Sequence, residues 1–195
     1  MKSKVNLSYL FYALITLVLL AASSASFAGH ADDTTRAFRG TMACGANHFR
    51  RLNGTERQFS AWAFRNFDDR QTIFVDRIRI YDATGQLRAD YAGTALPTFS
   101  LGDLGGTDNA LEPYQSATLL SSDMFGDHNF PHAERPLQMI VDWSASGRVL
   151  LLSLSHNRLV RDRIKDPVSG AVTLGDERSR GINSCRHIRV GRGWR

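Results

Sequence analysis

The segment 124–132 contains the side chains best suited to chemistry in this sequence. It holds four side chains of types that bind copper or zinc in exported proteins: Met124, Asp127, His128 and His132. The two histidines have the spacing of a metal-binding helix, but Pro131 lies between them and disfavours an unbroken helix. No Glu follows His128, so the zinc-protease motif is absent. We favour a polar surface loop with unlinked histidines and no cofactor, and the alternative is a copper or zinc site.

The sequence contains no motif of a hydrolase or of a nucleotide-binding loop. Gly-x-Ser-x-Gly is absent, and Ser153, Ser155 and His156 fall within one expected strand, where neighbouring side chains point to opposite faces. The Gly-rich run 104–107 lacks the Lys and the spacing of a phosphate-binding loop. An active site assembled from distant residues leaves no local signature, so a hydrolase without a local motif is kept as a third interpretation. No catalytic residue is predicted.

The two cysteines, Cys44 and Cys185, lie near opposite ends of the chain. In an oxidising compartment, two cysteines with no third partner favour one disulfide, and the alternative is a pair of buried thiols. A bond between them would close a loop of about 140 residues, which the chain-entropy model values at roughly 4–5 kcal/mol as an upper figure. We therefore predict that the first and last elements of the fold are neighbours.

The first 28 residues have the pattern of a cleaved signal peptide. Lys2 and Lys4 form a positive start, and residues 10–22 are an apolar run too short to span a membrane comfortably. Small residues place the cleavage after Ala28, with Ala25 as a second candidate and an uncleaved anchor helix as the alternative. We predict export to the periplasm or into the medium, with no membrane insertion after signal cleavage.

Cleavage would leave a loose, polar leader over residues 29–43 and a single domain over residues 44–195. The removed segment carries two Lys and no acidic residue, so the net charge falls from +5 to +3. The remaining Arg residues are spread along the chain and often stand beside Asp, whereas nucleic-acid binding favours clustered charge. The sequence therefore predicts no nucleic-acid partner.

Alternation of apolar and polar residues predicts short strands through most of the domain. Trp62 and Phe64 share one face of a strand over 59–66, and Ile78 and Ile80 share one face of a strand over 72–81. The turn 82–85 starts with Asp and ends with Gly, as type I turns prefer. Further strands are predicted over 86–91, 114–121, 137–143, 148–160 and 185–190.

The strand over 137–143 shows the clearest alternation, with Leu137, Met139, Val141 and Trp143 on one face. Residues 96–113 and 122–135 are rich in turn-forming residues and predict long irregular loops, the second with a short helical turn. Because no segment after residue 28 has a sustained helical period, the expected fold is all-β: a single antiparallel β-sandwich with long irregular loops.

Three runs resemble the immunoglobulin-like modules of bacterial cell-surface proteins, and among these the FxLYD type. They are Phe64-Arg65-Asn66, the run Ile78-Arg79-Ile80-Tyr81-Asp82-Ala83-Thr84-Gly85, and Leu111-Glu112-Pro113 before a strand. The resemblance covers roughly residues 59–121, and Tyr114 stands where the family usually has Gly. It implies an immunoglobulin-like binding or spacer module, and it transfers no catalytic residue.

The favoured function is that of an exported, non-enzymatic β-sandwich module that binds a partner protein or a component of the cell envelope. The alternative is a small exported copper- or zinc-binding protein that uses the 124–132 loop. A hydrolase without a local motif is the third interpretation.

Overall fold

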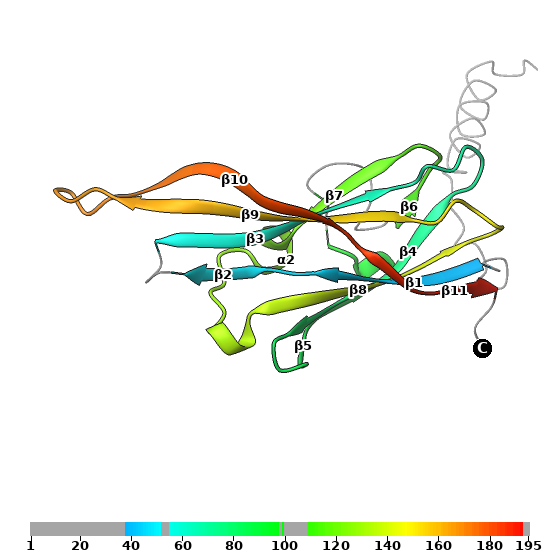
Figure 1. Cartoon of the computed structure of the whole chain (residues 1–195), viewed down its shortest axis with the longest axis horizontal. Helices are drawn as coiled ribbons and strands as arrows, with labels where there is room; N and C mark the ends of the chain where they lie inside the picture. The colour runs from blue at the N-terminus through cyan, green and yellow to red at the C-terminus, as the bar shows by residue number, and fades with distance from the viewer. Residues whose placement is uncertain (1–37, 52–54, 98, 100–108, 193–195) are drawn as a thin grey trace, which may run out of the picture. The chain divides into compact units, whose positions relative to one another are not determined.

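The computed structural model describes residues 38–51, 55–97, 99 and 109–192. The predicted signal peptide and residues 29–37 of the predicted leader lie outside these residues. The described chain is mostly antiparallel β-strand with almost no helix, arranged in two sheets, which confirms the all-β prediction (Figure 1). Among the described residues, no helix has both the length and the apolar character that crossing a membrane requires.

The first sheet has the strand order β11-β1-β8-β4-β5, and the short β6 also pairs with β4. Its strands are β1 (Phe38–Gly45), β4 (Ile73–Asp82), β5 (Leu87–Ala92), β6 (Ala110–Leu111), β8 (Pro136–Ala145) and β11 (Arg186–Arg192). The predicted turn between β4 and β5 is present: the Asp82 carboxylate accepts hydrogen bonds from the backbone N–H groups of Thr84 and Gln86. Gly85 closes the turn with φ of 81°, a conformation that favours glycine.

The second sheet has the order β10-β9-β3-β2, and β7 also pairs with β3. Its strands are β2 (His48–Arg51), β3 (Glu56–Arg65), β7 (Ser116–Leu120), β9 (Ser153–Lys165) and β10 (Val172–Ser184). The described helical segments are short: η3 (Gly93–Ala95), α2 (Ser121–Phe125) and η4 (His132–Glu134). The helical turn expected within 122–135 is therefore present as α2, which begins one residue earlier.

The inner faces of both sheets contribute to one hydrophobic core. Trp62 and Phe64 of the second sheet and Trp143 of the first are fully buried in it. Gly40 allows β1 to pass close to Trp143, because a Cβ at Gly40 would stand 2.4 Å from the indole ring. The aromatic residues of the predicted strands are therefore core residues.

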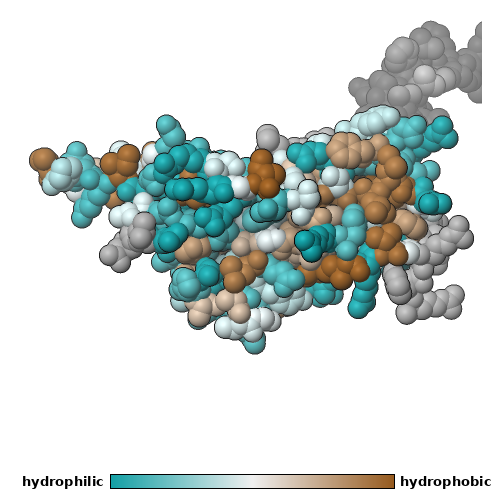
Figure 2. Space-filling view, viewed as in Figure 1, coloured by the Kyte–Doolittle hydropathy of each residue, from teal (hydrophilic) through white to brown (hydrophobic). Residues whose placement is uncertain are grey.

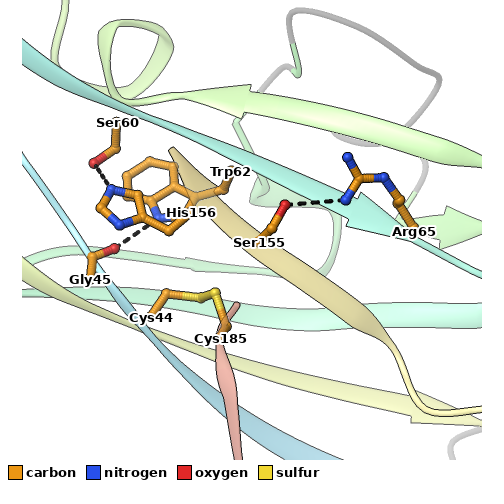
Figure 3. Close-up of a disulfide and its surroundings, with 8 residues drawn as sticks. All are labelled: Cys44, Gly45, Ser60, Trp62, Arg65, Ser155, His156 and Cys185. Atoms are coloured by element: carbon orange, nitrogen blue, oxygen red, sulfur yellow. Dashed lines mark hydrogen bonds between the residues drawn. A yellow bond between two sulfur atoms is a disulfide. The ribbon is translucent and has the colours of Figure 1, made fainter. Parts of the chain in front are cut away.

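The chain passes directly from one sheet to the other at two places, and the disulfide joins them. Cys44 stands near the end of β1, just before the chain enters β2, and Cys185 is the single residue between β10 and β11. The predicted Cys44–Cys185 bond is present, with the two Cα atoms 4.6 Å apart and a sequence separation of 141 (Figure 3). The first and last described strands are neighbours, since β1 pairs with β11.

Several strand boundaries differ from the sequence prediction. β1 begins at Phe38, inside the expected leader 29–43, because pairing on both sides with β11 and β8 orders a segment that has few large apolar residues. β2 and β10 were not predicted. β10 lacks apolar alternation, and its backbone pairing with β9 defines it instead. β9 starts and ends about five residues later than expected.

The alternation predicted for residues 137–143 is correct for three of its four apolar residues. Met139, Val141 and Trp143 are fully buried, whereas 39% of Leu137 is exposed. The pairing of β8 with β4 shifts near Pro136, so the inward–outward alternation is interrupted there. Leu137 consequently borders an open cavity.

Candidate functional site

The inward-facing row of β3 changes character along the strand. Trp62 and Phe64 lie in the hydrophobic core, whereas Glu56, Gln58 and Ser60 continue the same face and are buried polar residues. The partner strand β9 shows the same change, because His156 lies opposite Trp62 and Arg158 lies opposite Ser60. We call the part of the fold around Trp62 and Phe64 the closed half, because its inward-facing residues are apolar and packed. We call the part around Glu56, Gln58 and Ser60 the open half, because its inward-facing residues are polar.

A cavity of about 360 Å³ occupies the open polar half. It is lined from β2, β3, β9 and the start of β8, together with the chain at β1–β2 and at η4: Ala46, Asn47, Phe49, Arg51, Gln58, His132, Arg135, Leu137, His156 and Arg158. Three of these residues carry a permanent positive charge, and none is a carboxylate. The cavity is therefore a cationic concave surface with an apolar wall.

The three arginines of the cavity differ in their partners. Arg135 donates a hydrogen bond to the carbonyl of His132 at 2.7 Å, and its guanidinium lies 5.3 Å from the centre of the Phe49 ring. Arg51 and Arg158 form no ion pair or side-chain hydrogen bond with another residue that the structure describes. Their guanidinium groups are consequently available to a ligand.

The floor of the cavity is a chain of hydrogen-bonded polar side chains. The Asn47 amide donates to the Gln58 carbonyl oxygen at 2.9 Å, and the Gln58 amide donates to Glu56. Asn47 and Gln58 are almost completely buried, so these bonds fix the orientation of both amides. The Glu56 carboxylate is held by Gln58 and is not among the residues that line the cavity.

His156 joins the cavity to the disulfide region. Its Nε2 atom lies 2.8 Å from the Ser60 hydroxyl, and its ring stacks on Trp62, whose indole N–H donates to the Gly45 carbonyl (Figure 3). Burial, reinforced by the positive charge of Arg158, lowers the pKa of His156 from 6.5 to about 4. The imidazole is therefore neutral at pH 7 and serves as a fixed hydrogen-bonding wall.

The Ser60–His156 pair is the contact that most resembles a hydrolase dyad, and sequence reasoning did not identify it. Ser60 is fully buried beneath His156, so its hydroxyl is not exposed to a substrate in this structure. Ser155 lies on the opposite face of β9 and accepts a hydrogen bond from Arg65 at 3.1 Å. Ser153, Ser155 and His156 are thus divided between two faces of the sheet, as the sequence analysis expects of neighbours in a strand.

The 121–135 segment wraps around the edge of the second sheet. α2 packs on the outer face of β2 and β3, where Phe125 and Phe130 contact the ring of His48. Asn129 accepts a hydrogen bond from the backbone N–H of Arg50 at 3.1 Å and so occupies a free donor of the edge strand β2. Such a loop protects a sheet edge from pairing with other chains.

The four residues that the alternative interpretation gave as metal ligands lie at different places along this wrap. Asp127 forms an ion pair with Arg57 at 2.7 Å, and His128 packs on Phe130 with ring centres 4.3 Å apart. His132 contacts Phe49 instead, on the cavity side of β2, and Met124 packs against the core. Within the described ranges, no three His, Cys, Asp or Glu side chains gather as a metal site would require.

A two-stranded arm extends from the open half of the fold. The pairing of β9 with β3 ends at Asp162, and beyond Arg163 only β9 and β10 remain paired with each other (Figure 1). The arm ends in a turn over 166–170. Large apolar residues are exposed on the arm and its turn, with hydrophilic side chains between them (Figure 2): Ile164, Val168, Val172 and Leu174.

Sequence reasoning missed the cavity and the arm for the same physical reason. Arg51 and Arg158 reach one cavity only because β2 and β9 both pair with β3. The pairing of β3 with β9 joins strands that are far apart in the sequence, and a single sequence does not reveal it. The run His156-Asn157-Arg158 did carry a signal, since polar residues at alternate positions continue the apolar face of a strand.

No protein-family model and no curated protein matches this chain. Among solved structures, the crystal structure of Thermotoga maritima 1070 aligns with 77% of this chain and 94% of that chain, at 12% sequence identity and a TM-score of 0.34. A likeness at that level carries neither fold family nor function across.

Proposed function

We propose that the chain is an exported, non-enzymatic β-sandwich module, immunoglobulin-like in its two-sheet construction, which binds a partner protein at the cell envelope through the β9–β10 arm. The observation that carries this proposal is the exposure of apolar side chains on a hairpin with no core beneath it. An isolated two-stranded hairpin is marginally stable in water, and a partner that covers it would supply the missing burial.

The arm has a defined face to offer. Val172 and Leu174 share the outer side of β10 on the arm, since their partners Lys165 and Arg163 both lie on the outer side of β9. About half of the surface of each side chain is exposed, 48% for Val172 and 54% for Leu174. Burying such side chains gives roughly 1.5–3 kcal/mol each, so a few of them suffice to anchor a partner.

The base of the arm is also held in shape by ion pairs between its two strands. Arg161 pairs with Glu177 at 2.9 Å, and Arg178 pairs with Asp162 across the two strands. Two irregularities interrupt the pairing of β10 with β9, and bulges of this kind discourage simple edge-to-edge pairing between copies. The outer face, rather than the free edge, is therefore the surface that we assign to the partner.

Export rests on the signal-peptide pattern of residues 1–28, and the disulfide supports an oxidising compartment. Site-specific photo-crosslinking in the intact native envelope tests the proposal. A crosslinking amino acid at Val168 or at Leu174 is expected to give one discrete adduct. The same group at Thr84, in the exposed β4–β5 turn, is the matched control and should not give it. Equal adducts at all three positions, or none at the arm, would contradict the proposal.

A further inference from the structure

The cationic cavity lies in the open half of the fold and is separate from the outer face of the arm. Its volume of about 360 Å³ falls in the range of small-molecule pockets, roughly 300–1,000 Å³, and exceeds what a single inorganic ion needs. The cavity is therefore considered as a small-molecule site.

Charge defines one part of the ligand. Arg51 comes from β2, Arg158 from β9 and Arg135 from the chain before β8, so three elements bring guanidinium groups to one concavity. The two carboxylates that face this side from β3 and β9 are already occupied: Glu56 by Gln58 and Asp162 by Arg178. Guanidinium groups match the planar oxygens of carboxylates and phosphates, and a concave surface strengthens their field.

Neutral groups define the rest of the ligand. Phe49 offers a flat apolar surface, and Arg135 stacks against it at 5.3 Å. Asn47 and Gln58, at 5% and 2% exposure, line the cavity with amides that are oriented by their mutual hydrogen bond. Buried, fixed amides of this kind can form hydrogen bonds with hydroxyl groups of a ligand. A ligand that lacks hydroxyl groups would leave these amides partly unpaired, at a cost in binding free energy.

We propose that this cavity binds a small hydroxylated anion: a sugar-sized molecule that carries a phosphate or a carboxylate. Arg51 and Arg158 hold the charged group, Phe49 contacts the ring, and Asn47 and Gln58 bond its hydroxyl groups. Free molecules of this class and the end groups of envelope polysaccharides share this chemistry.

Isothermal titration calorimetry on the purified protein tests the site with four probes: glucose 6-phosphate, glucuronate, glucose and inorganic phosphate. We expect saturable binding of at least one of the two acidic sugars, and at least tenfold weaker binding of both glucose and inorganic phosphate. A charge-assisted hydrogen bond contributes about 1.5–3 kcal/mol, so Arg158→Ala and Arg51→Ala should each weaken binding by about 10- to 100-fold. Arg70→Ala, at an exposed position outside the cavity, is the control and should bind as the wild type does.

The proposal is overturned if neither acidic sugar binds at millimolar concentration, if glucose binds equally well, or if both cavity variants bind like the control. Melting temperatures of all variants are measured alongside, because Arg51 and Arg158 are exposed and their removal should leave the fold intact. An acidic oligosaccharide is then titrated as a fifth probe: binding weaker than that of the acidic monosaccharide indicates a free ligand, whereas tighter binding indicates a polysaccharide end. Photo-crosslinking at the arm is independent of all these results, so failure of this site and failure of the proposed function are distinguishable.

Discussion

The closed and open halves of the fold are built from the same strands. β3 and β9 run through both, with Trp62 and Phe64 facing inward in the first and Gln58 and Ser60 facing inward in the second. In the closed half the inner faces bury aromatic and aliphatic side chains, whereas in the open half they surround a polar cavity and continue into the arm. From this comparison we expect stability to depend mainly on the closed half, and the proposed function assigns recognition to the open half.

The largest effect on stability is expected when a large core side chain of the closed half is truncated. Trp143 is fully buried, so Trp143→Ala should cost about 3–5 kcal/mol of unfolding free energy, measured by chemical denaturation. Trp143→Phe is the matched control and should cost much less, because the indole N–H has no hydrogen-bond partner among the described residues and the ring volume is largely kept. Equal losses in the two variants would show that aromatic packing does not carry the stability of this half.

The disulfide tests how firmly the two sheets are joined. Cys44→Ser/Cys185→Ser should cost about 2–4 kcal/mol, because it removes a link that closes 141 residues of chain at the two sheet crossings. Cleavage by a protease should increase near residues 45–48 and 183–186. Intact-mass measurement after thiol alkylation first establishes the bond in the wild type, and two labelled thiols there would contradict the account.

Acid should destabilise the open half through its buried histidines. Burial, followed by the charge of Arg57, lowers the pKa of His48 to about 4, and that of His156 is similarly low. The unfolded chain, with histidine pKa near 6.5, binds protons that the folded chain does not, so stability is lost as pH falls from about 6.5 towards 4. Each histidine accounts for roughly 2–3 kcal/mol over that window.

Unfolding free energies measured at pH 7.0, 6.0 and 5.0 check this dependence. His156→Gln keeps a polar side chain beside Ser60 and should remove about half of the loss in stability over this range. If the variant and the wild type lose the same stability, the buried imidazole of His156 is not the source of the pH dependence.

The sequence was most informative where burial alternates along a strand. The pattern correctly placed Ile78, Ile80, Met139 and Val141 in the core, because an apolar residue at every second position is typical of a strand with one buried face. The cysteine pairing followed from the number of cysteines alone. β10 could not be found in this way, because its Gly and charged residues carry no alternation and only the pairing with β9 defines it.

The candidate sites were harder to predict because they depend on which strands become neighbours. Residues 124–132 are dense in side chains of metal-ligand types along the sequence. The fold nevertheless places Asp127, His128 and His132 at different positions around the edge strand β2. Arg51 and Arg158 are 107 positions apart and show no local pattern, yet they line one cavity.

The most direct test of the central claim combines a stability and a binding measurement on one arm variant. Val172→Ser/Leu174→Ser removes two exposed apolar side chains from the outer face of β10 on the arm. We predict a melting temperature within about 4 °C of the wild type, since two exposed substitutions at about 0.5 kcal/mol or less each cost at most about 1 kcal/mol. We also predict loss of the adduct that crosslinking at Val168 gives in the native envelope. An unchanged adduct in this variant would contradict the assignment of recognition to the arm.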